Sequence, residues 1–452
     1  MVLPKITAAL GASLPVQCAM PCPPLTDDSF QDLLARFAAV RDPRHPRGIR
    51  HSVQVILAIA AVAVACGARS FVAIGEWAFD APQWVLELVG ARWHRLRGRF
   101  VAPHEATLRR TIQAFDAELL DAVICGWVAQ QTGAKPVGGR WPAIAVDGKV
   151  VRGAWRPDGS QVNLLSAISH DTAVVLAQRE IAAKTNEIPE LPRLLADLDL
   201  TGVVVSADAL HTQRETARHL VADRGAHYVL TVKGNQPKLL AACRKLMSGP
   251  AGDFAPEHVT FDRGHGRTEQ RTTRVAPAGG EAAITFPYAA QVFRIRRDVG
   301  GLDCQRTTKE IAHCITSLTP EQARPEDLAG YIRGHWAIEN RLHYVRDVSF
   351  DEDRSQVRTG SGPHVMASLR NLAISALRLG GHTNIAEGLR WTARDPSRSL
   401  TLLGITGLCR GPGSQGYCEI PAAQTHSLRP HRTTCGTAGH TAELRVGTCG
   451  SG

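Results

Sequence analysis

The stretch AIAVDGKVVRGA (143–154) decides the expected fold of the central part of the chain. Small and β-branched residues fill its first half up to the pair Asp147-Gly148, which is typical of a buried strand that ends at a turn. Two segments of the same kind follow, NLLSAISH (163–170) and AVVLAQREIAA (173–183). The central part therefore begins with three successive predicted strands.

Helices and strands alternate after these three strands. We expect a helix at IPELPRLLADL (188–198), a short strand at GVVVSAD (202–208) and a second helix at TQRETARHLVADRG (212–225). A strand at HYVLTVKGN (227–235) and a helix at QPKLLAACRKLM (236–247) complete the pattern. This order predicts an α/β fold with a mixed sheet and flanking helices, in which functional side chains lie at strand ends.

The region before the sheet has a helical pattern over residues 29–130. Its longest apolar run, 55–68, is too short to span a membrane and predicts a buried helix. Two basic clusters, RDPRHPRGIRH (41–51) and ARWHRLRGRF (91–100), interrupt the helices. They are either solvated loops or a DNA-contacting face, because acidic residues are almost absent from them.

The region after the alternating elements is expected to be a β-rich insertion over about 250–318. Its basic segments HGRTEQR (265–271) and FRIRR (293–297) are either a DNA clamp or an exposed β ribbon. Helices return over about 325–346 and again at 361–381, within a domain that we expect to run from 141 to 406.

Composition and chain ends add weaker constraints. The 452 residues suit two or three domains, and a net charge of +10, with 44 of the 52 basic residues arginine, favours a nucleic-acid partner. G+C-rich coding also enriches arginine. The eleven cysteines are irregularly spaced without a CxxC pair, which predicts a reducing cytoplasm. Residues 1–28 resemble a loose leader, and 407–452, rich in glycine, are expected to be a disordered tail.

Two aspartates follow buried strands of the predicted sheet. Asp147 ends AIAV and Asp208 ends GVVVSA, so both are expected at the same sheet edge if the strands are neighbours. Asp147 also suits a turn, and Asp208 suits a helix N-cap. Clustered carboxylates repel one another until a divalent cation such as Mg²⁺ neutralises them. The pair therefore predicts a site for a hard cation.

A third acid is expected on the helix that runs from about Pro325 to Arg346. There His335, Glu339 and His343 are spaced four residues apart, and Arg346 falls on the same helical face. We choose Glu339, because a helical carboxylate facing two strand-end aspartates can complete a two-metal site for phosphoryl transfer. The competing acids for this position are Asp347, Asp351, Glu352 and Asp353.

Four blocks of the sequence resemble the signature blocks of DDE transposases. They are AIAVDGKVVRGA, VVVSADALHTQ (203–213), HYVLTVKGNQ (227–236) and HWAIENRLHYVRDVSFDEDRSQVRTG (335–360), in that order. They are similar to the insertion-sequence family that includes the H-repeat-associated proteins. The segment VRDPRHPRGIRHSVQVILAIAAVAVACGARSFVAIGEWA (40–78) resembles the N-terminal domain associated with that family. The resemblance covers about residues 30–406.

The resemblance implies a ribonuclease H-like catalytic core with Asp147, Asp208 and Glu339 as its catalytic and metal-binding triad, holding two ions of Mg²⁺ or Mn²⁺. It implies that the β-rich insertion lies between the second and third acids. Related enzymes carry a Tyr-Arg-Glu-Lys pattern on the third helix. Here Tyr331 is only two residues before Arg333, and Arg346 stands where lysine is expected.

The implied function is that of a transposase, which binds its element's terminal inverted repeats, cuts phosphodiester bonds and joins 3′-hydroxyl ends to target DNA. A catalytically inactive DNA-binding derivative and a nuclease without strand transfer are the alternatives. The expected partners are double-stranded DNA and a second copy in a homodimer, in the cytoplasm at the nucleoid, with no membrane. The expected DNA-binding residues are Lys149, Arg152, Lys233, Asn235, Gln236, Arg333, His335, Asn340 and Arg346.

Overall fold

The computed structural model describes residues 32–132, 140–182, 185–249, 254, 256–264, 266–279, 284–301 and 306–405. The leader and the tail expected from the sequence, 1–28 and 407–452, lie outside the described residues. Within the described part, none of the helices combines the length and the apolar composition needed to cross a membrane. The described cysteines, Cys66, Cys125, Cys243 and Cys314, carry free thiols.

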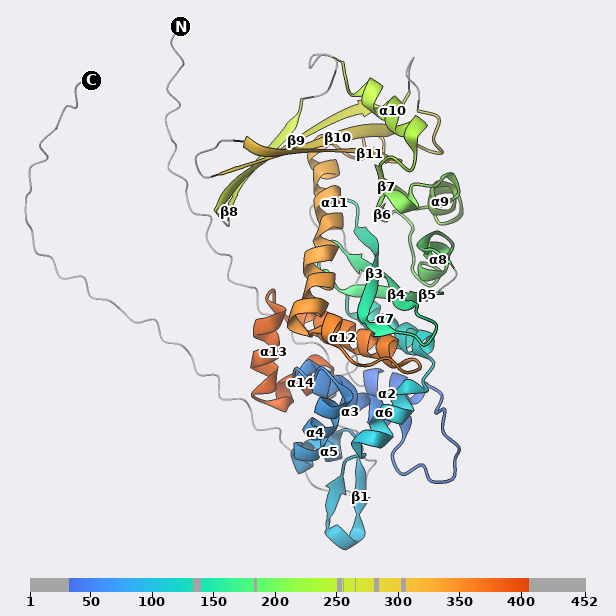
Figure 1. Cartoon of the computed structure of the whole chain (residues 1–452), viewed down its shortest axis with the longest axis vertical. Helices are drawn as coiled ribbons and strands as arrows, with labels where there is room; N and C mark the ends of the chain where they lie inside the picture. Colours follow the sequence, from blue (N-terminus) through green and yellow to red (C-terminus); the bar gives the residue numbers. More distant parts are fainter. Residues whose placement is uncertain are drawn as a thin grey trace, which may run out of the picture. The chain divides into compact units, whose positions relative to one another are not determined.

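A mixed sheet of nine strands lies at the centre of the described chain (Figure 1). Its order is β5-β4-β3-β6-β7-β11-β10-β9-β8. In chain order, the first five strands of this sheet are β3 (Ala143–Trp155), β4 (Gln161–Ser169), β5 (Val175–Ile181), β6 (Val204–Ala207) and β7 (His227–Val232). β3, β4 and β5 are antiparallel neighbours, whereas β6 and β7 continue parallel to β3. This arrangement confirms the predicted ribonuclease H-like mixed sheet.

The β-rich insertion extends the same sheet. It forms β8 (His258–Gly264), β9 (Arg267–Pro277), β10 (Gln291–Gly301) and β11 (Arg306–Thr316), all paired antiparallel. β11 joins β7 with His313 opposite Val232, so backbone hydrogen bonds run without a break from the first five strands into the insertion. The insertion is therefore a wing of the central sheet.

Helices cover both faces of this sheet. One face carries α8 (Glu187–Leu194), α9 (Arg214–Arg218) and α10 (Pro237–Leu246), whose apolar side chains share a core with alternate residues of β3, β6 and β7. The opposite face carries α11 (Pro325–Ile338), which packs on the remaining residues of the same strands. Figure 1 shows α11 running beside β3 from the β8–β11 wing toward α12.

A helical region precedes the sheet, as the sequence predicts. Its elements are α2 (Asp32–Ala38), α3 (Val53–Ala65), α4 (Phe71–Asp80), α5 (Gln83–Leu88), α6 (Glu105–Gln113) and α7 (Ala117–Thr132). Twelve of the 13 residues of α3 are buried. They share one core with α12 (Gly362–Leu379) and with α13 (Ile385–Ala393) and α14 (Pro396–Leu402), so the last helices complete the N-terminal helical layer.

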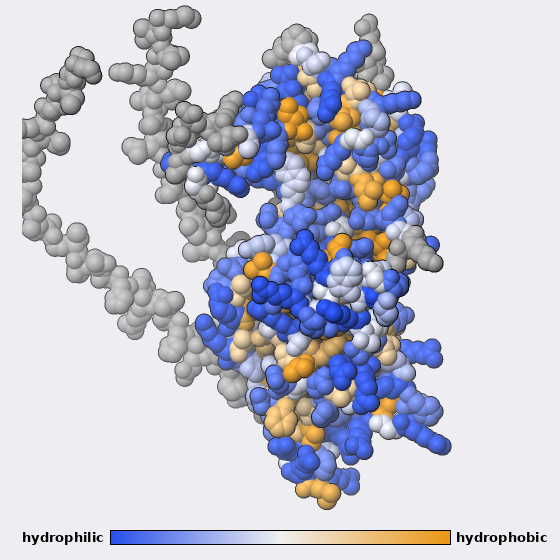
Figure 2. All heavy atoms as spheres, in the orientation of Figure 1, coloured by the Kyte–Doolittle hydropathy of each residue, from blue (hydrophilic) through white to orange (hydrophobic). Residues whose placement is uncertain are grey.

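The second basic cluster, 91–100, forms a β-hairpin, which the sequence analysis does not predict. β1 (Arg92–His94) and β2 (Arg99–Val101) pair antiparallel on either side of a short 3₁₀ turn. Trp93 packs edge-on against Phe100 across the pair, with 5.0 Å between ring centroids. Figure 2 shows an apolar patch at the end of this hairpin, where Leu96 is 95% exposed.

We call α11 together with the two π-helical turns that follow it, residues 325–349, the α11 segment. A buried ion network joins the end of this segment to α12. Both guanidinium groups of Arg346 and Arg370 bind the carboxylate of Glu352, each at 2.7 Å, and all three side chains are almost fully buried. Although burial opposes ionisation, the two guanidinium charges hold the pKa of Glu352 at about 2. Gln178 of β5 accepts hydrogen bonds from Arg346 and from Asn371, which ties the network to the sheet.

We predict that Glu352→Gln strongly destabilises the protein. The substitution leaves two buried guanidinium groups without a counter-charge, and breaking a buried pair in this way costs about 3–5 kcal/mol. The measurement is urea unfolding followed by circular dichroism at pH 7. Asp351→Asn, at a neighbouring carboxylate whose side chain is 40% exposed, is the matched control and should change the unfolding free energy by less than about 0.5 kcal/mol. Equal stability of the two variants would contradict the role given to Glu352.

Candidate active site

Strand pairing brings the two predicted aspartates together. β3 and β6 are parallel neighbours, with Val146 opposite Ala207. Asp147 and Asp208 are the next residues after this pair along the two segments, so they lie side by side at the carboxyl end of β6. The expectation that these two strands are neighbours is confirmed.

The two-residue period of a strand decides which face the aspartates occupy. Ala143 of β3 and Val204 of β6 share a core with α11, whereas Val146 and its neighbours in register belong to the core beneath α8–α10. Because successive side chains alternate between faces, Asp147 and Asp208 point to the α11 face. Asp208 also accepts a hydrogen bond from the Leu210 backbone N–H at 2.9 Å, so it caps the following turn as well.

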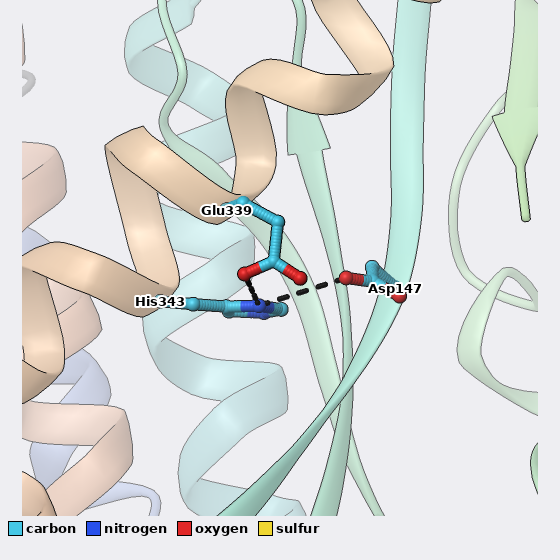
Figure 3. Close-up of side chains that lie close together, drawn as sticks. All are labelled: Asp147, Glu339 and His343. Carbon is cyan, nitrogen blue, oxygen red and sulfur yellow. Dashed lines mark hydrogen bonds and ion pairs between the residues drawn. The ribbon is translucent and has the colours of Figure 1, made fainter. Parts of the chain in front are cut away.

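Glu339 lies at a change in helical geometry. The sequence predicts one α-helix from Pro325 to Arg346, but the α-helix ends at Ile338 and continues as two π-helical turns, Glu339–His343 and Val345–Ser349. Single π-helical turns are frequent at functional sites, because the wider turn redirects side chains. Glu339 remains 68% exposed in its side chain, facing Asp147 (Figure 3).

A pocket of about 610 Å³ opens beside these acids. Its walls come from the sheet, the α11 segment and the wing. The lining includes Asp147, Asp208, Glu339, Lys233, Arg297, Glu310, Ile295 and Trp336. All three predicted acids therefore border one cavity, large enough for a nucleotide-sized group.

The electrostatics of this cavity are dominated by carboxylates. Burial, together with the charges of nearby acids, raises the pKa of Asp147 to about 7. Those acids are Glu339, Glu187 and Asp208, in decreasing order of effect. The hydrogen bond from His343 lowers the pKa of Glu339 instead.

Glu187 was not anticipated from the sequence. It begins α8, and its carboxylate approaches β3 so closely that a Cβ at Gly148 would lie 2.1 Å from its Oε1 atom. His211, fully buried, contacts the same carboxylate at 3.1 Å. The expected turn at Asp147-Gly148 is wrong, because β3 continues to Trp155 and Gly148 pairs with Leu165 inside it. The missing side chain of Gly148 leaves room for Glu187 instead.

The acids that competed with Glu339 are engaged elsewhere. Asp347 binds the Lys149 ammonium at 2.7 Å, and Asp353 lies 3.4 Å from Arg152. Glu352 belongs to the buried network described above, and Asp351 lies 3.9 Å from the Arg354 guanidinium. Each of these carboxylates has a cationic partner, which leaves Glu339 as the acid that faces the aspartates.

The residues expected to bind DNA near β3 differ in accessibility. Lys149 is 8% exposed and is neutralised by Asp347, so its charge is already compensated within the protein. Arg152 lies farther along the strand with its side chain 75% exposed. Arg152 is therefore the better placed of the two to reach a phosphate.

Three further predicted residues follow β7. Lys233 is exposed and lines the pocket. The amide of Asn235 donates to the Ala209 carbonyl at 2.6 Å, and that of Gln236 donates to the Thr212 carbonyl at 2.9 Å. These amides fasten the loop after β7 to the turn that follows Asp208, so they hold the site together.

A second, more basic pocket of about 660 Å³ borders the outer side of α11. Two of the predicted DNA-binding residues, Arg333 and Asn340, line it, and Arg333 also forms an ion pair with Asp262 of β8. Further basic lining residues are Arg140, Arg271 and Arg341. Ile295 and Trp336 line both pockets, so the basic pocket adjoins the acidic one.

His335 and Arg346 are buried, contrary to the simplest expectation for DNA contacts. His335 is 6% exposed and lies 3.4 Å from the Ser206 hydroxyl, although its edge reaches the acidic pocket. Arg346 has no exposed surface and serves the network around Glu352. The DNA contact of Arg346 stays a prediction, and in this structure its guanidinium is engaged within the protein. The π-helical turns rotate it away from the face that an α-helix would have given it.

The residues present fit a divalent metal ion. Ligand atoms of Asp147, Glu339 and His343 all lie within 4.8 Å of one another. Carboxylate oxygens are the ligands that Mg²⁺ and Mn²⁺ prefer. Burial and then the charges of the neighbouring acids raise the pKa of Asp147, and a bound cation would offset both effects. Asp208 borders the same pocket and adds a further carboxylate.

Comparisons with known proteins show the family of this chain. The family model described as "Transposase DDE domain" matches residues 141–376, and the one described as "DDE_Tnp_1-associated" matches 34–128. YncI of Escherichia coli O157:H7, named as a predicted transposase, is 28% identical over 77% of this chain and 88% of its own. An uncharacterised protein in the dhlA 3′ region of Xanthobacter autotrophicus is 32% identical over 52% of this chain and 77% of its own.

One further relative and one solved structure are also similar to this chain. YhhI of Escherichia coli K12, named as an H repeat-associated predicted transposase, is 29% identical over 52% of this chain and 63% of its own. Among solved structures, a piggyBac transposase synaptic complex with hairpin DNA aligns over 84% of this chain and 79% of its own. That alignment has a TM-score of 0.37 and 11% sequence identity.

We predict that Asp147→Asn stabilises the metal-free protein. A carboxyl whose folded pKa is raised to about 7 stabilises the fold only while it is protonated, so this contribution is lost as pH rises through 7. The amide removes that loss, and the expected gain at pH 8 is about 4 kcal/mol, falling to nearly zero below pH 4. Thermal unfolding in EDTA at several pH values measures it. A variant less stable than wild type at pH 8 would contradict the proposed repulsion.

Proposed function

This chain belongs to the transposase DDE domain family, and from this premise we propose that it is an enzyme that cuts and joins DNA. It binds the terminal inverted repeats of its own element, hydrolyses phosphodiester bonds there, and joins the resulting 3′-hydroxyl ends to target DNA. Water is the nucleophile of the first reaction, and the DNA 3′-hydroxyl is the nucleophile of the second.

One observation carries this proposal. The acids predicted as a triad, Asp147, Asp208 and Glu339, come from three separate segments of the chain and border one pocket. The other candidate acids of the 347–353 segment are each bound or close to a cationic side chain. A set of carboxylates without compensating charge suits metal-assisted phosphoryl transfer better than it suits a structural role.

The triad residues would hold the two divalent ions, Mg²⁺ or Mn²⁺, that we propose as cofactors. When bound, such ions activate the attacking hydroxyl and stabilise charge on the leaving oxygen. The carboxylates of Asp147 and Asp208 are fixed by strand pairing, and that of Glu339 by the packing of α11. The exposed Lys233 ammonium at the rim would orient a phosphate of the DNA backbone.

The path of the DNA strand is proposed from the surrounding charge. The basic pocket, which adjoins the acidic one, offers phosphate contacts to a DNA strand that crosses the α11 segment, and the exposed Arg152, farther along β3, offers another. Trp336 borders both pockets, with a ring 37% exposed that can pack against a sugar or base. The exposed Arg333 and Asn340 contribute from α11.

The N-terminal helices would supply a further share of DNA binding. Both ends of the hairpin β1–β2 carry exposed arginines, and the cluster 41–51 exposes Arg41, Arg47 and Arg50. By contrast, Arg44 is held by Asp42 at 2.7 Å. We expect a homodimer to act on paired element ends, and we expect this to occur at the nucleoid in the cytoplasm.

We predict that alanine at any one of Asp147, Asp208 or Glu339 abolishes cleavage and leaves binding to element ends largely intact. Losing one ligand of a metal site removes transition-state stabilisation, whereas most DNA affinity comes from phosphate contacts elsewhere. The measurement incubates the full chain with labelled element ends and Mg²⁺, and resolves bound, cut and joined products. Asp351→Ala is the control, and it should cut at the wild-type rate.

The same assay separates the alternatives. A wild-type chain that binds without cutting would be an inactive derivative, and one that cuts without joining would be a nuclease. A Glu339→Ala variant that cuts at an undiminished rate would show that Glu339 is the wrong third acid, with Asp347 the next to test.

We predict that replacing the hairpin arginines lowers the salt dependence of DNA binding. Arg92, Arg95, Arg97 and Arg99 are all exposed, and each phosphate contact contributes about 0.9 to the slope of log K against log salt. The fourfold alanine variant should therefore lose up to about 4 units of slope. Arg44→Ala, at an arginine already paired with Asp42, is the control and should change the slope by much less. An unchanged slope in the fourfold variant would leave the hairpin without a role in DNA binding.

A further inference from the structure

His343 lies inside the group of candidate metal ligands without being one of the predicted triad. It is 4% exposed and stands one helical turn after Glu339 in the first π-helical turn. Its Nδ1 atom is 3.3 Å from the nearer carboxylate oxygen of Glu339 and 3.6 Å from that of Asp147. Figure 3 shows the ring edge turned toward the space between the two carboxylates.

These separations match those between ligands of one ion. Two ligand atoms that are each about 2.1 Å from an ion, at a right angle to each other, are about 3 Å apart. The Nδ1 atom lies at nearly this distance from both carboxylates, and the three ligand atoms all lie within 4.8 Å. One ion therefore fits among the three groups after small side-chain shifts.

The other contacts of the ring do not explain its position. Its Nε2 atom is buried and has no hydrogen-bond partner among the described residues. The comparable His335, one turn before Glu339, is instead 3.4 Å from a hydroxyl, that of Ser206. The nearby Lys149 ammonium is bound to Asp347, so its charge is compensated there. The polar surroundings that hold the His343 ring are the two carboxylates themselves.

We propose that Nδ1 of His343 is a protein ligand of the divalent ion held by Asp147 and Glu339. This inference rests on the proposed function, because it assumes that the triad binds a metal. It adds a nitrogen ligand to a site otherwise made of oxygen. Imidazole is a better ligand for Mn²⁺ and later transition ions than for Mg²⁺, so the site is expected to prefer Mn²⁺ over Mg²⁺ more strongly than an all-carboxylate site would.

The direct test is pulsed electron paramagnetic resonance on the full chain loaded with one equivalent of Mn²⁺. A directly bound imidazole produces a nitrogen modulation of the Mn²⁺ echo. We expect this modulation in the wild-type protein, and we expect it to change when the protein is made with ¹⁵N-labelled histidine. This measurement needs neither DNA nor catalytic activity, and it needs no variant that must fold.

Two variants assign the nitrogen. In His343→Gln the nitrogen modulation should disappear, and Mn²⁺ affinity by calorimetry should fall about tenfold or more, with a change below about threefold for Mg²⁺. His335→Gln is the matched control, on the same helical segment, similarly buried and on the other side of Glu339. It should retain the modulation. Circular dichroism establishes that both variants are folded.

The outcomes separate this inference from the proposed function. If Mn²⁺ binding depends on Asp147 but shows no nitrogen modulation, or if the modulation persists in His343→Gln, the metal site stands and the ligand role of His343 is overturned. If wild type and Asp147→Asn bind Mn²⁺ equally, both the metal centre of the proposed function and the role of His343 are overturned.

Discussion

Repulsion among carboxylates is the constraint on which the arrangement of the site depends. Glu187, Glu339 and Asp208 lie near Asp147, which is inside β3, and burial together with their charges raises the pKa of Asp147 to about 7. Such a group disperses unless rigid elements hold it. The parallel pairing of β3 with β6 fixes two of the acids, and the packing of α8 and α11 on opposite faces of the sheet fixes the others.

The buried network around Glu352 anchors the α11 segment at its far end. Arg346 follows Glu339 by seven residues, and its guanidinium is locked between Glu352 and Gln178. Arg370 links the same carboxylate to α12, whose residues share a core with α3. The position of Glu339 is thus tied to the N-terminal helical layer through a chain of buried charges.

The two aspartates could be predicted because they depend on local pattern, although only Asp208 follows the end of its strand and β3 continues past Asp147 to Trp155. Apolar runs that end in aspartate identify Asp147 and Asp208, and the two-residue period then places both on one face. Glu187 could not be found in this way, because its approach depends on the packing of α8 against the Gly148 position. The error in the helical face of Arg346 has a different origin. A helical period of 3.6 residues assigns it to the face of Glu339, but two π-helical turns intervene, and nothing in the residue pattern signals them.

The ion pairs within the wing limit which of its arginines could contact DNA. Because β11 pairs with β7, Arg297 and Glu310 reach the acidic pocket and form one of its walls. Arg297 is bound to Glu269 and Glu310, and Arg271 is paired with Asp262. Much of the positive charge that made these segments candidates for a DNA clamp is therefore compensated within the sheet. On the proposed function, a DNA strand that approaches the acidic pocket would meet more accessible positive charge at the pocket rim, where Lys233 is exposed, than on the wing. This favours a DNA route along the α11 segment over one across the face of the wing.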